Sequence, residues 1–120
     1  PPLAAGLVTR PWGESSTTRS RSNPRADPSG RPLWLETDKD TVDAVQAIAE
    51  ARDVSMAQIA LAWVLHNPVV SAPIVGATKP HHLADAAAAL AVHLTGEEVA
   101  ALEEHYTPRL PTYYGTKSGF

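Results

Sequence analysis

Apolar residues in the second half of the chain recur every three or four positions, which is the period of an amphipathic helix. After Asp38, the residues Val42, Val45 and Ile48 keep this spacing. Arg52-Asp53 interrupts it with two charged residues. The pattern therefore predicts a helix from about Asp38 that closes at positions 52–53.

A second helix is predicted to begin at Ser55. Gln58 stands three residues later, and this pair of residue types forms a capping box in which each side chain bonds the other residue's backbone N–H. Pro68 is expected to end the helix, because proline lacks the N–H that the next turn needs. The expected apolar face consists of Met56, Ile59, Ala60, Trp63 and Val64.

Two further helices are predicted closer to the C-terminus. Pro80 fits the first position of one, with Thr78 or Lys79 at its N-cap, because the N–H that proline lacks would have no partner there. This helix is expected to run through an alanine-rich stretch to about Leu90. The last helix is predicted to begin with a second capping box, Thr95 and Glu98, and to continue through Val99, Leu102 and Tyr106 until Pro108.

Two segments are expected to be extended. Residues 69–75, ending before Gly76, are rich in β-branched side chains and predict one complete buried strand. Residues 1–8 fit the end of another strand. Alternation of helix, strand and helix predicts a parallel α/β architecture. A single strand leaves its backbone groups without neighbours, so we expect the other strands to belong to chain upstream.

The intervening segment, residues 9–38, is rich in Ser, Thr, Arg, Pro and Gly. Such a composition buries little apolar surface, which predicts a flexible polar loop. Residues 107–120 contain Pro108 and Pro111 and are expected to form an extended C-terminal tail.

Charge and composition narrow the classes of function. The chain has 120 residues, a net charge of −3 and no cysteine. Nucleic acid is not an expected partner, because phosphate binding needs clustered positive charge. Disulfides are excluded, no apolar run is long enough to span a bilayer, and no signal peptide is apparent. We therefore expect a cytoplasmic protein without membrane contact. The start at Pro1-Pro2-Leu3, without methionine, predicts an incomplete or processed chain.

Residues 74–85 carry the strongest chemical signal, because they combine a glycine turn with basic residues at a predicted helix start. A helix N-terminus attracts phosphate through its unpaired N–H groups and its dipole. Gly76 allows close backbone approach, Thr78 offers a hydroxyl and Lys79 a positive charge. His82 and Asp85 follow at three-residue intervals on the same helix face. The alternative is an ordinary strand-to-helix junction with a solvated lysine. Adjacent His81 and His82 point about 100° apart, so no metal site is expected.

Three segments resemble the aldo-keto reductases, especially the longer bacterial members similar to potassium-channel β subunits. Residues 1–9, PPLAAGLVT, resemble the family's Ser-Pro-Leu-Ala-x-Gly segment. Residues 54–65, VSMAQIALAWVL, resemble its Ala-Gln-x-Ala-Leu-x-Trp helix. Residues 72–83 resemble its eighth strand and the following loop. The resemblance implies that residues 1–120 are the C-terminal part of a (β/α)8 TIM barrel, mostly helical here, with the strand at about 69–75.

The resemblance also implies the cofactor NADP(H) and the residues that hold it. The opening segment, with Pro2, Leu3 and Gly6, would touch the pyrophosphate. The adenosine 2′-phosphate would be held by Gly76, Ala77, Thr78 and Lys79. The adenine would lie beside His82, where the family often has Arg or Gln, and Asp85. Ala86 replaces a common Asn and Pro1 a common Ser, which removes one contact at each end.

The implied function is the NADPH-dependent reduction of small aldehydes or ketones to alcohols. The family's catalytic Asp, Tyr, Lys and His come from the first half of its barrel, so no residue of this chain is assigned a catalytic role and the segment alone is expected to be inactive. Two alternatives stay open: a small helical interaction module without chemistry of its own, and a truncated gene product. Upstream coding sequence with that catalytic series would distinguish them.

Overall fold

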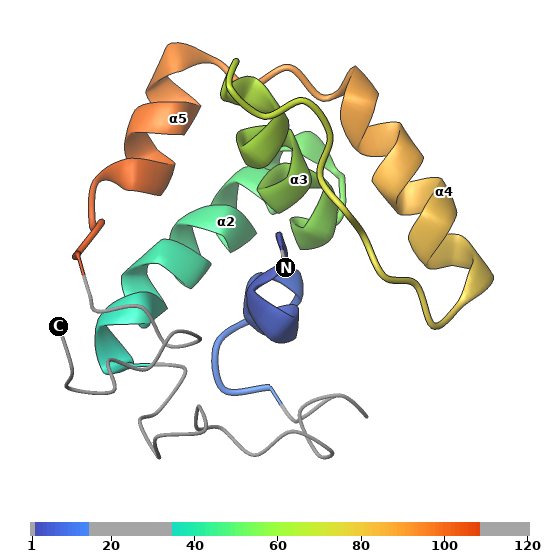
Figure 1. The fold of residues 1–120 in the computed structure, drawn as a ribbon. Helices are drawn as coiled ribbons and strands as arrows, with labels where there is room; N and C mark the ends of the chain where they lie inside the picture. The colour runs from blue at the N-terminus through green and yellow to red at the C-terminus, as the bar shows by residue number, and fades with distance from the viewer. Residues whose placement is uncertain (1, 15–34, 109–120) are drawn as a thin grey trace, which may run out of the picture.

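Helices account for the regular secondary structure of residues 2–14 and 35–108, which this computed structural model describes (Figure 1). The predicted first helix is present as α2, Lys39–Arg52. It is preceded by a short 3-10 helix, η2, Glu36–Asp38. Asp53 ends α2 in the left-handed conformation, with φ 53°, which Asp adopts more easily than most residues. The Val54 N–H then donates to the Ala49 carbonyl oxygen, 3.0 Å away, and closes the helix end.

The predicted second helix is α3, Met56–His66, and its capping box is confirmed. The Gln58 N–H donates to Ser55 Oγ over 3.2 Å, and the Ser55 N–H donates to Gln58 Oε1 over 3.0 Å. Met56, Ile59 and Ala60 are buried, as the apolar pattern predicts. Val64 is only half-buried. Trp63 departs furthest from the prediction, since 43% of it is exposed and its Nε1 donates to Glu103 Oε1 over 2.9 Å.

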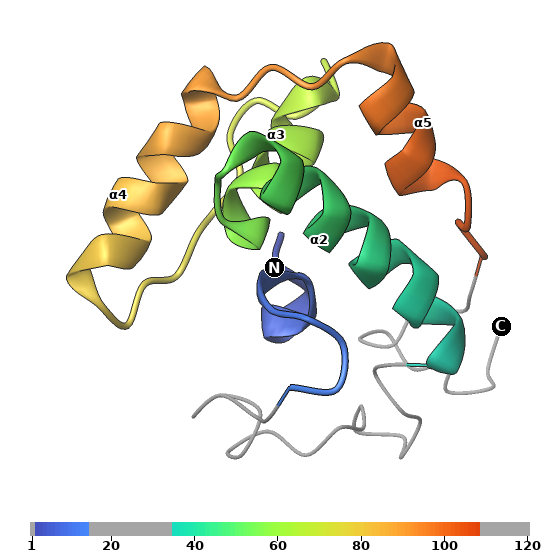
Figure 2. The ribbon, with the colours of Figure 1, turned by 180° about the vertical axis from the view of Figure 1, so that it is seen from behind.

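The last two helices are α4, Pro80–Ala88, and α5, Gly96–Glu103. α4 begins with Pro80 after an N-cap at Lys79, and it continues into a 3-10 turn, η3, Ala89–Ala91. The Thr95–Glu98 capping box of α5 is confirmed. α5 ends at Glu103, before the predicted Tyr106. α4 and α5 lie on opposite sides of α3 (Figures 1 and 2).

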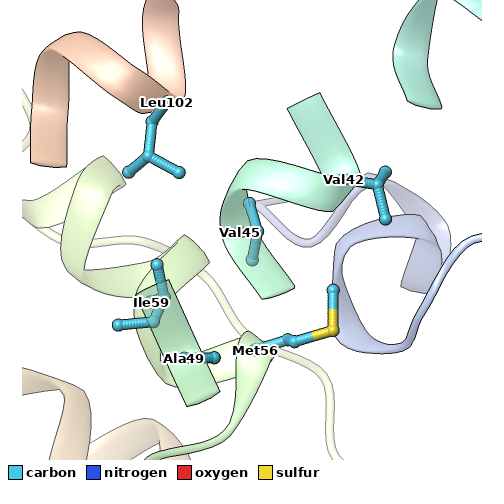
Figure 3. Packing of buried hydrophobic residues seen from close by; sticks show 6 residues of the cluster. All are labelled: Val42, Val45, Ala49, Met56, Ile59 and Leu102. Carbon is cyan, nitrogen blue, oxygen red and sulfur yellow. The ribbon is translucent and has the colours of Figure 1, made fainter. Parts of the chain in front are cut away.

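A small core lies where α2, α3 and α5 meet (Figure 3). Ile59 and Val42 are its largest fully buried side chains. Each helix contributes one apolar face, so the cluster removes from water the surfaces that the periodic pattern predicts. The buried members of the cluster are Val42, Val45, Ala49, Met56, Ile59 and Leu102.

A polar contact fastens α5 to the end of α2. Arg52 Nε and Nη2 donate to the two carboxylate oxygens of Glu98, each over 2.7 Å. Nη2 also donates to the His93 carbonyl oxygen over 2.8 Å. The bond from Arg52, followed by the one from the Thr95 N–H, lowers the pKa of the Glu98 carboxyl. This two-bond geometry links the first turn of α5 to the last turn of α2.

Two predictions about extended segments are wrong. No strand occurs in residues 2–14 or 35–108, and the predicted complete strand at 69–75 is instead turn and irregular extended chain. Its residues lack a neighbouring strand in the described structure, and β-structure requires one. The predicted strand end in residues 1–8 is replaced by a 3-10 helix, η1, Ala4–Thr9.

The predicted loop and tail lie largely outside the described residues. Within the segment 9–38, Thr9 belongs to η1 and Glu36–Asp38 form η2, so both of its ends carry regular structure. Residues 15–34 are outside the described part, and so is the tail beyond Pro108.

Candidate functional site

The predicted phosphate-binding residues lie where an extended segment turns into α4. Residues 72–77 have no regular structure, and Lys79 keeps an extended backbone, φ −138° and ψ 148°, as the N-cap of α4. Pro80 then begins the helix. The predicted N-cap and first helical position are therefore confirmed, and the positive end of the α4 dipole opens at Lys79.

The side chains at this junction are accessible. Thr78 and Lys79 are exposed, as are Gly76 and Ala77, while His82 and Asp85 are half-buried on α4. Lys79 makes no side-chain capping bond and no ion pair within the described residues. Its ammonium is therefore available to an anion from outside the chain.

His82 ties the loop to the first turn of α4. The Thr78 N–H donates to His82 Nδ1 over 3.4 Å, and the His82 N–H donates to the Lys79 carbonyl oxygen over 3.1 Å. The His82 ring meets the His81 ring edge to face, with centroids 4.5 Å apart. Thr78, Lys79 and His82 are therefore brought together as the sequence predicts.

Pro2, Leu3 and Gly6 lie in and beside η1. The Gly6 N–H donates to the Leu3 carbonyl oxygen over 2.8 Å, and Gly6 has φ +95°. The Gly6 carbonyl oxygen accepts from Thr9 Oγ1 at 2.8 Å and from Arg10 Nη2 at 3.1 Å. A Cβ at position 6 would lie 2.8 Å from that Nη2 atom. The backbone angle therefore favours glycine, and a Cβ would push the flexible Arg10 guanidinium away from the Gly6 carbonyl.

Arg10 is a site candidate that the sequence reasoning missed. Its guanidinium lies over Gly6, within the segment that resembles a pyrophosphate-binding motif. The available signal was the Thr-Arg pair three and four residues after the glycine, because a tight turn returns those side chains to the Gly6 carbonyl.

The two groups of candidate residues do not touch one another. η1 and the start of α4 stand apart in both views (Figures 1 and 2). Both elements contact α3, so this helix carries the two groups in a fixed relation.

The described residues also bear on metal binding and on membrane spanning. No group of three or more His, Cys, Asp or Glu side chains is placed to hold a metal ion in residues 2–14 and 35–108. Among the helices of the described part, none is long and apolar enough to cross a membrane. His105 approaches Asp40 Oδ2 at 4.0 Å and Glu104 Oε2 at 3.8 Å, but all three side chains are well exposed.

Comparison with known proteins identifies the family. The model of the Aldo/keto reductase family matches residues 1–107. The chain therefore belongs to the aldo/keto reductase family, whose members generally use NAD(P)H. The match includes both η1 and the α4 junction, so the two groups of candidate residues lie within one family domain.

The chain is similar to several fungal members. It is 38% identical over 108 residues to versiconal hemiacetal acetate reductase of Aspergillus parasiticus, which covers 90% of this chain and 31% of that protein. It is 39% identical to a putative aryl-alcohol dehydrogenase of Saccharomyces cerevisiae, with the same coverage. A putative voltage-gated potassium channel subunit beta of Schizosaccharomyces pombe is 31% identical, over 89% of this chain and 33% of that protein. The chain thus spans about a third of these relatives.

Proposed function

We propose that this chain is the C-terminal, cofactor-binding portion of an NADP-dependent aldo-keto reductase that reduces aldehydes or ketones to alcohols. The observation that carries the proposal is the family match over residues 1–107, which includes both η1 and the exposed, basic start of α4. In this proposal residues 1–120 belong to one catalytic domain, with 9–38 as a polar loop and 107–120 as a tail.

The start of α4 is proposed to hold the adenosine 2′-phosphate. The exposed Lys79 ammonium has no competing carboxylate in the described residues, and Gly76, Ala77 and Thr78 leave backbone and hydroxyl groups accessible beside it. Phosphate gains from both the charge and the helix dipole at such a position. His82 and Asp85, on the next turn of α4, are proposed to contact the adenine.

The pyrophosphate is proposed to lie at η1, separate from the adenosine position. Pro2 and Leu3 lead into the tight turn at Gly6, whose positive φ favours glycine. When bound, the nicotinamide of the cofactor would supply a hydride for the reduction.

The exposed segment 69–75 is proposed to face the rest of a (β/α)8 barrel in the complete domain. Residues 71–77 form no backbone hydrogen bond with the rest of the described chain. Val69 and Ile74 are 82% and 89% exposed although both are apolar and β-branched. Contact with the rest of the barrel would satisfy the backbone groups and bury these side chains together.

The substrate class is proposed to include aromatic aldehydes, because one relative is named an aryl-alcohol dehydrogenase. No residue of this chain is assigned the proton transfer, so the chain alone should be inactive. The test is oxidation of NADPH with 4-nitrobenzaldehyde, followed by absorbance. The protein with its complete aldo-keto reductase domain should turn over and residues 1–120 should not. Turnover by the purified chain would refute the proposal that the catalytic residues lie outside residues 1–120. No turnover by the complete protein would favour an interaction module.

A further inference from the structure

We propose that Arg10 is a positioning residue for the cofactor: with Thr9 it holds the Gly6 carbonyl oxygen, and it thereby keeps η1 in the shape that receives the pyrophosphate. The inference rests on the proposed function, because it concerns the pyrophosphate position at η1. It goes beyond that function, because Arg10 acts on the protein backbone and not by contact with the cofactor.

Side-chain donors converge on the Gly6 carbonyl oxygen. Thr9 Oγ1 donates to it over 2.8 Å, Arg10 Nε over 3.3 Å and Arg10 Nη2 over 3.1 Å. Nη2 also donates to Thr9 Oγ1 over 3.2 Å, so the two side chains are linked to each other. A hydroxyl that accepts one hydrogen bond while it donates another is polarised, which strengthens both bonds. Thr9, Arg10 and the Gly6 carbonyl therefore form one network, and loss of either side chain weakens the hold of the other.

The backbone of η1 needs this support. Ala4 has φ 48° and Gly6 has φ 95°. A residue with a side chain disfavours the left-handed region, so the conformation at Ala4 is retained only where the surrounding contacts determine it. A 3-10 helix adds little stability of its own, because its hydrogen bonds are less well aligned than those of an α-helix. The bonds from Thr9 and Arg10 supply the additional contacts.

Gly6 joins the two halves of this segment. Leu7 and Val8 pack against the buried cluster, and η1 contacts α2 and α3. On the other side, the Gly6 N–H donates to the Leu3 carbonyl oxygen over 2.8 Å. Rotation about the Gly6 backbone, which glycine permits, would move residues 2–5 relative to the packed residues. Because Arg10 holds the Gly6 carbonyl, it opposes that rotation and preserves the part of η1 that is proposed to meet the pyrophosphate.

The experiment measures the dissociation constants of NADPH and NADH by fluorescence titration, in the protein with its complete domain. Arg10→Met removes the donors and keeps an unbranched side chain, whereas Arg10→Lys keeps the charge without the planar fork of donors. Thr9→Val removes the hydroxyl, and Thr9→Ser keeps it. Arg52→Met is the matched control, because Arg52 makes a comparable network between α2 and α5, outside η1.

Arg10→Met should raise both dissociation constants about threefold to tenfold, the effect of losing one or two hydrogen bonds. Both cofactors should weaken together, because the pyrophosphate is common to them. Thr9→Val should weaken both in the same way, Thr9→Ser should restore binding, and Arg10→Lys should recover at most part of the loss. Thr9→Val combined with Arg10→Met should show less than the product of the two single effects, because both residues act on one oxygen.

Arg52→Met should bind both cofactors as the wild type does, even where thermal melts show that it is less stable. Wild-type binding by both Thr9→Val and Arg10→Lys would show that the Arg10 charge contacts the cofactor directly, and it would overturn the inference. Unchanged binding by Arg10→Met, weakening of NADPH alone, or equal weakening by Arg52→Met would also overturn it. If the wild type itself binds neither cofactor, the proposed function is refuted and the inference falls with it.

Discussion

Ile59 tests the packing that holds α2, α3 and α5 together. Its side chain is 0% exposed and lies in the cluster of buried residues shown in Figure 3. Ile59→Ala removes three carbon atoms, worth about 0.8 kcal/mol each by transfer alone. The remaining cavity adds to this, so we expect a loss of about 3 kcal/mol in the free energy of unfolding. Ile59→Val removes one carbon and should cost about 1 kcal/mol.

Urea unfolding of the chain, followed by circular dichroism at the helix band, measures these differences. Leu83→Ala is the matched control, because Leu83 lies on α4 and is 59% exposed. This variant should stay within about 0.5 kcal/mol of the wild type. The reasoning fails if Ile59→Ala is as stable as Leu83→Ala, or if Ile59→Val costs as much as Ile59→Ala.

Two further predictions concern η1 and the contact between α2 and α5. Gly6→Ala should destabilise the chain more than Gly13→Ala. Both positions have positive φ, but a Cβ at position 6 meets the Arg10 side chain, whereas a Cβ at position 13 meets nothing. Thermal melts that rank the two variants in the reverse order would contradict this prediction. The lowered pKa of Glu98 means that its contact with Arg52 contributes stability above the ordinary carboxyl pKa of 4.5 and loses it as the pH falls through the lower folded value. Glu98→Gln should therefore show a smaller loss of stability between about pH 5 and pH 3 in urea titrations, and an unchanged loss would count against that contact.

Local signals predicted the helices well, because the groups that determine them lie close in sequence. The capping boxes at Ser55 and Thr95 are confirmed, since each box is complete within four residues. Pro80 at the start of α4 follows from its missing N–H in the same way. The grouping of Thr78, Lys79 and His82 was predictable for the same reason, because all three lie within five positions at the start of α4.

Features that depend on distant residues were not predictable. A β-branched run such as 69–75 signals a strand, but whether it pairs depends on neighbours that the segment does not contain. Trp63 fits the apolar face of α3, yet its indole N–H finds Glu103, 40 residues away, and the ring remains partly exposed. η1 requires left-handed backbone at Ala4 and Gly6 and the bonds from Arg10, none of which hydrophobic periodicity reports.

The central claim is that the start of α4 holds the 2′-phosphate of NADP(H), and Lys79→Ala tests it most directly. Fluorescence titration of the protein with its complete domain should show the NADPH dissociation constant rising on the order of tenfold, because one charge-assisted contact is lost. The NADH constant should hardly change, and the difference should shrink as salt increases, since Lys79 is exposed. Equal weakening of both cofactors, or of neither, would contradict the assignment of Lys79 to the phosphate.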